Sequence, residues 1–194
     1  MPTTVVLVEP DPRWPEAFRA ERRRLGGALA PYSLAVEHIG STAVPGLPAR
    51  PTVDILLGLY RLSDAPRVVR RMGDLGYLYL PKYEDVLPER RFFRAPSDTA
   101  ARAVFHVHAA EVASAFFERH VVFRDWLRTH SQDRDAYARL KREAAARFPD
   151  DRGAYTDAKA PFIRGVEGKA RAAAAAGGKP KAHGAANPPP PGEV

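Results

Sequence analysis

The chain has 194 residues, of which 45% are hydrophobic, and this length suits one domain followed by a tail. It contains no cysteine, which excludes disulfides, thiolate metal sites and a cysteine nucleophile. The formal net charge is +7, but no nucleic-acid-binding motif accompanies it, so nucleic acid is not an expected partner. Without a secretory signal or an apolar run of membrane-spanning length, we expect a cytoplasmic protein with no membrane partner.

The N-terminal part of the chain alternates apolar runs typical of strands with amphipathic stretches typical of helices. Helices are expected at residues 11–30 and 64–75, the second capped by Ser63 and ended by Gly76. Strands are expected at residues 5–9, 34–39, 52–59, 77–80, 91–94 and 103–109, the last two as a hairpin.

The C-terminal part of the chain is expected to be helical. One helix is predicted at residues 113–129, a second around the stripe from Tyr137 to Phe148, and a third after Asp150 as its cap. From residue 168 the chain is rich in Ala, Gly and Pro and is expected to be disordered, although its alanine-rich start can extend the last helix.

Asp54 is the most informative single residue, because it is an acid inside an otherwise apolar strand. Val53 and Ile55 point to one face of such a strand, and Asp54 and Leu56 point to the other. A carboxylate there is costly to ionise unless it is paired, hydrogen-bonded or metal-bound. We interpret Asp54 as a catalytic and metal-binding residue; the alternative is a strand-end acid that accepts hydrogen bonds from loop amides.

A turn of small residues follows the strand at 34–39, and its candidate phosphate-binding residues are His38, Gly40, Ser41 and Thr42. A Gly-Ser pair lets backbone amides and a hydroxyl approach phosphate oxygens closely. Polymerase-β-like nucleotidyltransferases have such a turn, followed by a strand with two acids that bind two divalent metals. Here Leu56 stands at the second acid position, so two-metal catalysis is not implied.

His106 and His108 share one face of a strand and could bind one metal ion or one phosphate group. Together with Asp54 they are the candidate catalytic and metal-binding residues, and Mg²⁺ or Mn²⁺ is the expected cofactor. The alternative is that one or both are hydrogen-bonded core or edge histidines. A histidine-triad hydrolase would need a third histidine at position 110, where the chain has Ala110.

Five basic residues could bind phosphate, namely Arg50, Arg90, Arg91, Arg94 and Lys159, and Arg50, Arg91 and Lys159 are selected from them as site residues. Arg50 precedes the Asp54 strand, and Lys159 lies one helical turn after Tyr155. For each of them singly, a solvated surface charge is the alternative interpretation. Arg124–Asp125 and Lys141 in the helical part are expected to form surface ion pairs.

The combination of these motifs resembles the GrpB family. The resemblance is carried by residues 37–47, 51, 54–55, 91–94, 106–108, 123–125, 151–152, 154–155, 159 and 162–163. It implies a nucleotidyltransferase-like fold with a single acid on the Asp54 strand, and it assigns Gly40 and Ser41 to the phosphate turn. A related domain is fused to dephospho-CoA kinase in some actinobacteria, which implies a nucleotide- or CoA-linked setting.

These observations together predict an α+β (α/β) domain over residues 1–167 and a disordered tail over residues 168–194. The domain is expected to contain a nucleotidyltransferase-like mixed sheet of about five strands and a helical C-terminal half. The leading hypothesis is a protein that binds a nucleoside triphosphate and a divalent metal and transfers a nucleotidyl group to an acceptor. The alternatives are a non-catalytic nucleotide- or CoA-binding module and a His-dependent metal phosphohydrolase.

Overall fold

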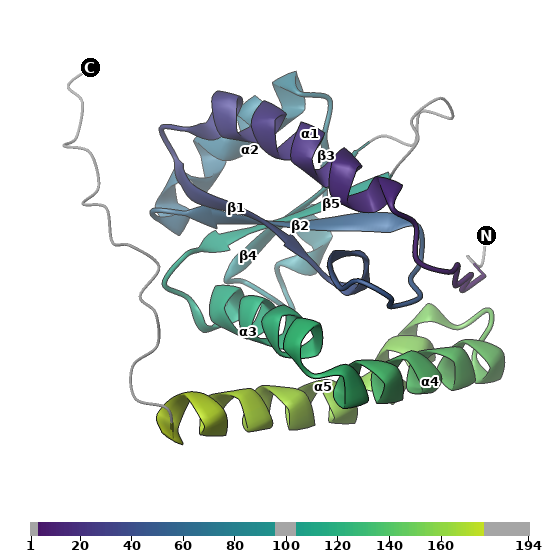
Figure 1. Cartoon of the computed structure of the whole chain (residues 1–194). Helices are drawn as coiled ribbons and strands as arrows, with labels where there is room; N and C mark the ends of the chain where they lie inside the picture. Colours follow the sequence, from purple (N-terminus) through teal and green to yellow (C-terminus); the bar gives the residue numbers. More distant parts are fainter. Residues whose placement is uncertain (1–3, 96–103, 177–194) are drawn as a thin grey trace, which may run out of the picture.

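The structure of the chain is a computed structural model that describes residues 4–95 and 104–176. In this part of the chain, one sheet contains the strands β1 (Ser33–Ile39), β2 (Thr52–Leu59), β3 (Leu78–Tyr79), β4 (Arg90–Arg94) and β5 (Val104–Glu111). Their spatial order is β1-β2-β5-β4-β3. Strands β2 and β5 run parallel, whereas the other neighbouring pairs are antiparallel (Figure 1). The expected mixed sheet of an α+β domain is therefore confirmed.

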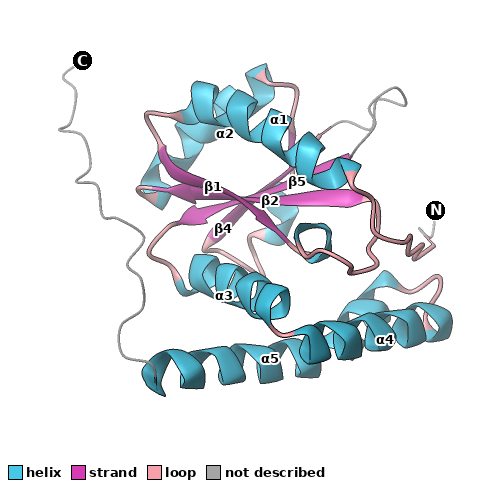
Figure 2. Ribbon diagram, viewed as in Figure 1, coloured by secondary structure: helices cyan, strands magenta, loops and turns pink. Residues whose placement is uncertain are grey.

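Helices cover both faces of the sheet (Figure 2). Helices α1 (Arg13–Leu29) and α2 (Ala65–Asp74) lie on one face, and α3 (Ala115–Thr129), α4 (Ser131–Arg147) and α5 (Arg152–Ala176) lie on the other. The alanine-rich start of the expected tail belongs to α5, and residues 177–194 lie outside the described residues. Among the helices described, none combines the length and the apolar character that crossing a bilayer requires.

The alternating residues of β2 contribute to two separate cores. Val53, Ile55 and Leu57 are fully buried in a cluster with residues of α1 and α2. Leu56 packs instead against Phe116 and other apolar residues of α3. Asp54 shares the face of Leu56, as the alternation predicts, and therefore points toward the C-terminal helices rather than toward α1 and α2.

Three local expectations were wrong. Residues 5–9 form no strand in the described structure: Val8 makes a single bridge to Ala49, while the amide of Val5 bonds to the carbonyl of Pro149, so no ladder continues.

The side chain of Ser63 does not cap α2, which follows a short 3₁₀ turn, Leu62–Asp64. The predicted cap of α5 is shifted by one residue, because the Asp151 carboxylate accepts a hydrogen bond from the Ala154 amide and Asp150 binds the hydroxyl of Thr4. The antiparallel pairing of β4 with β5 is confirmed, and most of the connection between them lies outside the described residues.

Gly40 begins the turn after β1 in a backbone conformation that favours glycine, with φ of 70°. The antiparallel register pairs Ile39 with Asp54, which places Gly40 directly beside the acid. A Cβ atom added at Gly40 would lie only 2.7 Å from Oδ2 of Asp54. The turn therefore accommodates the Asp54 carboxylate only because position 40 has no side chain.

We expect Gly40→Ala to lower the free energy of unfolding by about 2 kcal/mol, because it combines a strained positive φ with a clash against a carboxylate. Urea unfolding followed by circular dichroism measures this change. The matched control is Gly73→Ala in α2, where an added Cβ meets nothing within 4 Å. That change should leave stability unaltered or raise it by about 0.5–1 kcal/mol. Equal effects at the two positions would contradict the interpretation.

Candidate functional site

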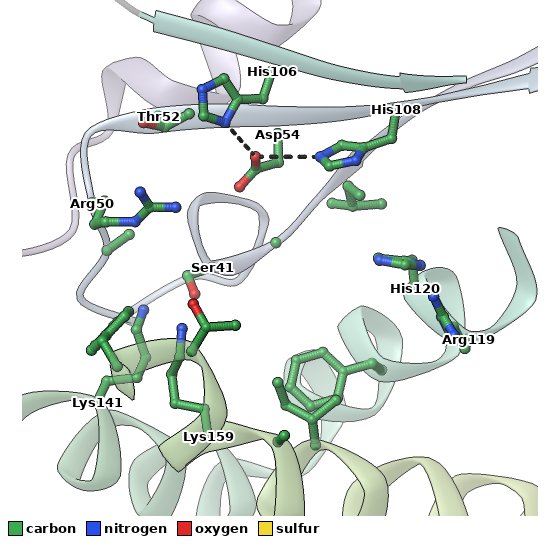
Figure 3. Close-up of a pocket in the computed structure, with 18 of the residues that line it drawn as sticks. Ser41, Arg50, Thr52, Asp54, His106, His108, Arg119, His120, Lys141 and Lys159 are labelled. Carbon is green, nitrogen blue, oxygen red and sulfur yellow. Dashed lines mark ion pairs between the residues drawn. The ribbon is translucent and has the colours of Figure 1, made fainter. Parts of the chain in front are cut away.

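A cavity of about 1150 Å³ lies between the Asp54 face of the sheet and helices α3, α4 and α5 (Figure 3). It brings together most of the residues selected from the sequence. Those that line it are Gly40, Ser41, Thr42, Arg50, Asp54, His106, His108 and Lys159. Two selected residues, His38 and Arg91, are not part of its lining.

The carboxylate of Asp54 is flanked by the two histidines of β5. Oδ1 of Asp54 lies 3.5 Å from Nδ1 of His106 and 3.8 Å from Nε2 of His108. The parallel register produces this arrangement, because Asp54 pairs with His106 and Leu56 with His108. Burial alone would raise the pKa of Asp54, but hydrogen bonding from the two histidines, reinforced by charge attraction when a ring is protonated, holds that pKa well below its usual range. Asp54 is therefore ionised, with a quarter of its side chain (25%) exposed.

The protonation state of His108 follows from its second neighbour. Nη1 of Arg90 lies 2.9 Å from Nδ1 of His108. A guanidinium can only donate, so Nδ1 accepts and the proton of a neutral His108 is on Nε2, facing Asp54. Burial also lowers the pKa of His108, which favours the neutral ring. Arg90, His108 and Asp54 thus form a chain in which each donor faces an acceptor.

These contacts limit which residues of the site can bind a metal ion. Within the described ranges, no three or more His, Asp or Glu side chains are grouped so that they could hold a metal ion. Nε2 of His108 presents a proton to Asp54, so this nitrogen does not fit as a metal ligand in the present arrangement. Asp54 itself fits, because nucleotide-bound Mg²⁺ often takes one or two carboxylates together with phosphate oxygens. A phosphohydrolase with both histidines on one metal would require the His108 ring to give up its contact with Asp54 or with Arg90.

Lys141 is a cavity residue that sequence reasoning placed on the surface, and that expectation was wrong. Its side chain is 2% exposed, and Nζ donates a hydrogen bond to the carbonyl of Pro48. Burial lowers the pKa of Lys141 to about 7. The signal was present in the sequence, since Lys141 lies one turn after Tyr137 and one turn before Ala144 on the inward stripe of α4.

Lys159 and Arg50 lie at the same end of the cavity as Lys141 and Ser41 (Figure 3). Nζ of Lys159 lies 3.8 Å from the ring centroid of Tyr155, and burial lowers the pKa of Lys159 to about 8. Repulsion from Arg50 contributes to the lowered pKa values of both lysines. The three side chains thus form a cationic wall opposite Asp54.

The turn that follows β1 is held in place by two arginines of α3. Arg124, expected on the surface, is buried: Nη1 donates to Oε2 of Glu37 (2.6 Å) and to the carbonyl of His38 (3.0 Å). Arg128 donates to the carbonyl of Ala43 at the other end of the turn (2.9 Å). The surface ion pair expected of Arg124 is in fact a buried contact that fixes the turn, although Arg124 also pairs with Asp125.

His38 supports the turn from behind rather than facing the cavity. Its Nε2 lies 3.0 Å from the hydroxyl of Thr42, and its ring stacks on Phe18 with 4.7 Å between centroids. Burial lowers the pKa of His38 to about 4, so the ring is neutral at physiological pH. The structure therefore places His38 as a support of the Gly40–Ser41 turn.

Arg91 lies on the face of β4 opposite the cavity. There it pairs with Glu84 (3.2 Å) and donates a hydrogen bond to the carbonyl of Pro88 (2.9 Å). Its neighbour Arg90 shares a face with Phe92 and lines the cavity instead. Further residues of the lining that were not selected as site residues from the sequence are Tyr83, Arg119, His120 and Arg152.

Comparisons with known proteins agree with this architecture. The family described as GrpB protein matches residues 4–169. A UPF0157 protein of Pseudomonas aeruginosa is 39% identical over 170 residues, which cover 87% of this chain and 69% of that protein. Another, from Halalkalibacterium halodurans, is 37% identical and covers 87% of this chain and 84% of its own length.

A solved structure and a longer protein extend the comparison. The crystal structure of the conserved protein GrpB from Enterococcus faecalis has a TM-score of 0.74 and 32% identity, and the match covers 85% of this chain and 96% of that one. A dephospho-CoA kinase of Mycolicibacterium paratuberculosis is 30% identical over 183 residues, 82% of this chain but only 44% of the kinase. From its sequence, its matched length and its fold, the chain belongs to the GrpB family.

Proposed function

We propose that the chain is a nucleotidyltransferase-like protein that binds a nucleoside triphosphate in this cavity and transfers a nucleotidyl group to an acceptor. The observation that carries the proposal is the cationic wall of Arg50, Lys141 and Lys159 opposite the ionised Asp54 (Figure 3). In the part of the chain that the structure describes, none of the three cations pairs with a carboxylate; Lys141 meets a carbonyl and the ring of Tyr137, and Lys159 meets an aromatic ring. A buried cation such as Lys141 is costly without an ion-pair partner, and a polyphosphate would supply the opposite charge.

The turn between β1 and β2 suits a phosphate group. The amides of Ala43 and Val44 are bonded within the turn, to the carbonyls of Gly40 and Ser41, each at 3.2 Å. The hydroxyl of Ser41 faces the cationic wall (Figure 3). This arrangement leaves the hydroxyl and the first amides of the turn to meet a phosphate oxygen.

Asp54, together with phosphate oxygens of the ligand, would hold Mg²⁺ or Mn²⁺, which neutralises phosphate charge when bound. Beside the Asp54 carboxylate, a neutral His106 is favoured with its proton on Nδ1, which leaves the lone pair on Nε2. In the proposed transfer the acceptor oxygen bonds to the α-phosphorus, the bond to pyrophosphate breaks, and Nε2 of His106 takes the acceptor's proton. The cationic wall would stabilise the departing pyrophosphate.

A second candidate function is a binding module for a CoA-like molecule without turnover. The observation that favours it is the similarity to the dephospho-CoA kinase of Mycolicibacterium paratuberculosis over most of this chain. Such a ligand carries phosphates that the same cationic wall could bind. Dephospho-CoA and CoA therefore belong in every binding experiment beside the nucleotides.

The first test is calorimetry with ATP, GTP, CTP, UTP, CoA and dephospho-CoA in the presence of Mg²⁺ or Mn²⁺. We expect at least one nucleoside triphosphate to bind, and Asp54→Asn to weaken that binding by about tenfold or more, because the cation loses its anionic protein ligand. Asp74→Asn, at the exposed end of α2, is the matched control and should bind as the parent does. The proposal fails if no nucleotide binds or if Asp54→Asn binds equally well; binding of CoA alone would support the module instead.

The second test separates stability from binding at Lys141. Replacing a buried, unpaired charge with an apolar residue of similar size is often neutral or stabilising. We therefore expect Lys141→Met to keep or raise the free energy of unfolding while it weakens nucleotide binding about tenfold or more. Lys169→Met, at an exposed position paired with Asp133, should leave binding unchanged. A marked loss of stability in Lys141→Met, with binding retained, would contradict the assignment.

The third test uses the pH dependence of nucleotide binding. The pKa values of about 7 for Lys141 and about 8 for Lys159 lie below the ordinary value, so both lysines lose their charge as pH rises from 7 to 9. Affinity for a triphosphate should therefore fall across this interval. In the ligand-free protein, these two lysines should make the free energy of unfolding increase with pH over the same interval. Their pKa values are higher in the unfolded chain, which therefore binds more protons than the folded chain. Lys159→Arg keeps its charge and should make the fall in affinity shallower; an unchanged slope would argue against Lys159 as a phosphate ligand.

A further inference from the structure

A second group of cations lies at the α3 end of the cavity, away from Arg50 and Lys159 (Figure 3). Its centre is Arg90, which is 8% exposed and lines the cavity. The guanidinium carbon lies 4.9 Å from the ring centroid of Phe92 and 5.9 Å from that of Phe116. Arg90 is therefore a buried cation packed among aromatic rings.

The hydrogen bonds of Arg90 are incomplete. Nη1 is satisfied by the uncharged acceptor Nδ1 of His108. Nε is buried and has no hydrogen-bond partner among the described residues. Buried donors in folded proteins are nearly always paired, and an unpaired one next to a cavity indicates an acceptor supplied by a bound molecule.

Arg119 brings a second guanidinium to the same place. Its guanidinium carbon lies 4.8 Å from the ring centroid of Phe116, so two cations contact one aromatic ring. The charges repel each other, and Arg119 is one cause of the lowered pKa of Arg90, after burial. Within the described ranges neither arginine forms an ion pair with a carboxylate. An anion between them would offset both the burial and the repulsion.

A purely structural role for Arg90 explains only part of this geometry. Fixing the protonation of His108 requires the contact through Nη1 and nothing more. It accounts neither for the unpaired Nε nor for the position of Arg119 over Phe116. Both features are explained by an oxyanion, because a guanidinium presents its donors in a planar fork that matches carboxylate and phosphate.

We propose that Arg90 and Arg119 form a second anion subsite, distinct from the cationic wall of Arg50, Lys141 and Lys159, which binds a carboxylate or phosphate group of the acceptor. The subsite itself is inferred from the geometry of Arg90; its assignment to the acceptor rests on the proposed nucleotidyl transfer. Asp54 and His108 lie between Arg50 at one end of the cavity and Arg119 at the other (Figure 3). The acceptor is accordingly a small anionic molecule rather than a neutral alcohol or sugar.

The test is a selenate soak of crystals of the full chain, with anion positions found from the anomalous signal of selenium. We expect one peak within hydrogen-bonding distance of Arg90 and a second among Arg50, Lys141 and Lys159. Arg90→Gln should lose the first peak and keep the second, and Arg50→Gln should do the reverse. Arg70→Gln, exposed on α2, is the matched control and should keep both. The absence of a peak at Arg90 in the parent, or its persistence in Arg90→Gln, overturns the subsite.

Titration calorimetry with malonate and with inorganic phosphate shows which oxyanion the subsite takes. Arg90→Gln should weaken binding of the preferred anion by about tenfold or more, and Arg90→Lys should retain part of the affinity because it keeps the charge but loses the fork. If Arg90 only positions His108, nitrogen NMR of the His108 ring will change in Arg90→Gln while anion binding stays at the parent level, which overturns the proposal. An anion at Arg90 with none at Arg50 would defeat the proposed function and leave the subsite standing.

Discussion

The structure depends on one carboxylate held in ionised form on the inner face of a buried strand. Asp54 lies on β2, whose neighbouring residues are fully buried, and it stays charged because two histidines of the adjacent parallel strand approach it. The turn before β2 begins with a glycine because the carboxylate occupies the space of a side chain. Arg124 and Arg128 of α3 bind carbonyls at the two ends of that turn. The acid, the turn and α3 are therefore joined by direct contacts.

The chemistry of the cavity is divided between the two halves of the fold. Strands β2 and β5 supply Asp54 and the two histidines, and the C-terminal helices supply Lys141 and Lys159. In the proposed function a polyphosphate would contact both halves, because Arg50 precedes β2 whereas Lys141 and Lys159 belong to α4 and α5. The packing of α4 and α5 against the turn, through Val44 and Leu47, brings the two sets together. The helical half is thus part of the site and not only a cover for the sheet.

The sheet and the direction of Asp54 could be predicted from the sequence because strand alternation is a local rule. The cavity-facing residues of other elements could not be predicted equally well. Arg90 and Arg91 differ by one position, and a one-residue change of register reverses which of them faces the site. The sequence predicts a surface position for Lys141 and Arg124 because charged residues are usually exposed, whereas their burial depends on how α3 and α4 pack on the turn. The roles assigned to the site residues remain predictions.

The contact between Gly40 and Asp54 has a consequence for how such sequences can change. A side chain at position 40 is incompatible with an aspartate at position 54, so position 40 cannot change while the acid is kept. Loss of the acid would remove that clash, but the positive φ at position 40 would still favour glycine over residues with a side chain. The dependence is therefore one-sided: an aspartate at position 54 requires glycine at position 40, whereas glycine at position 40 does not require the aspartate.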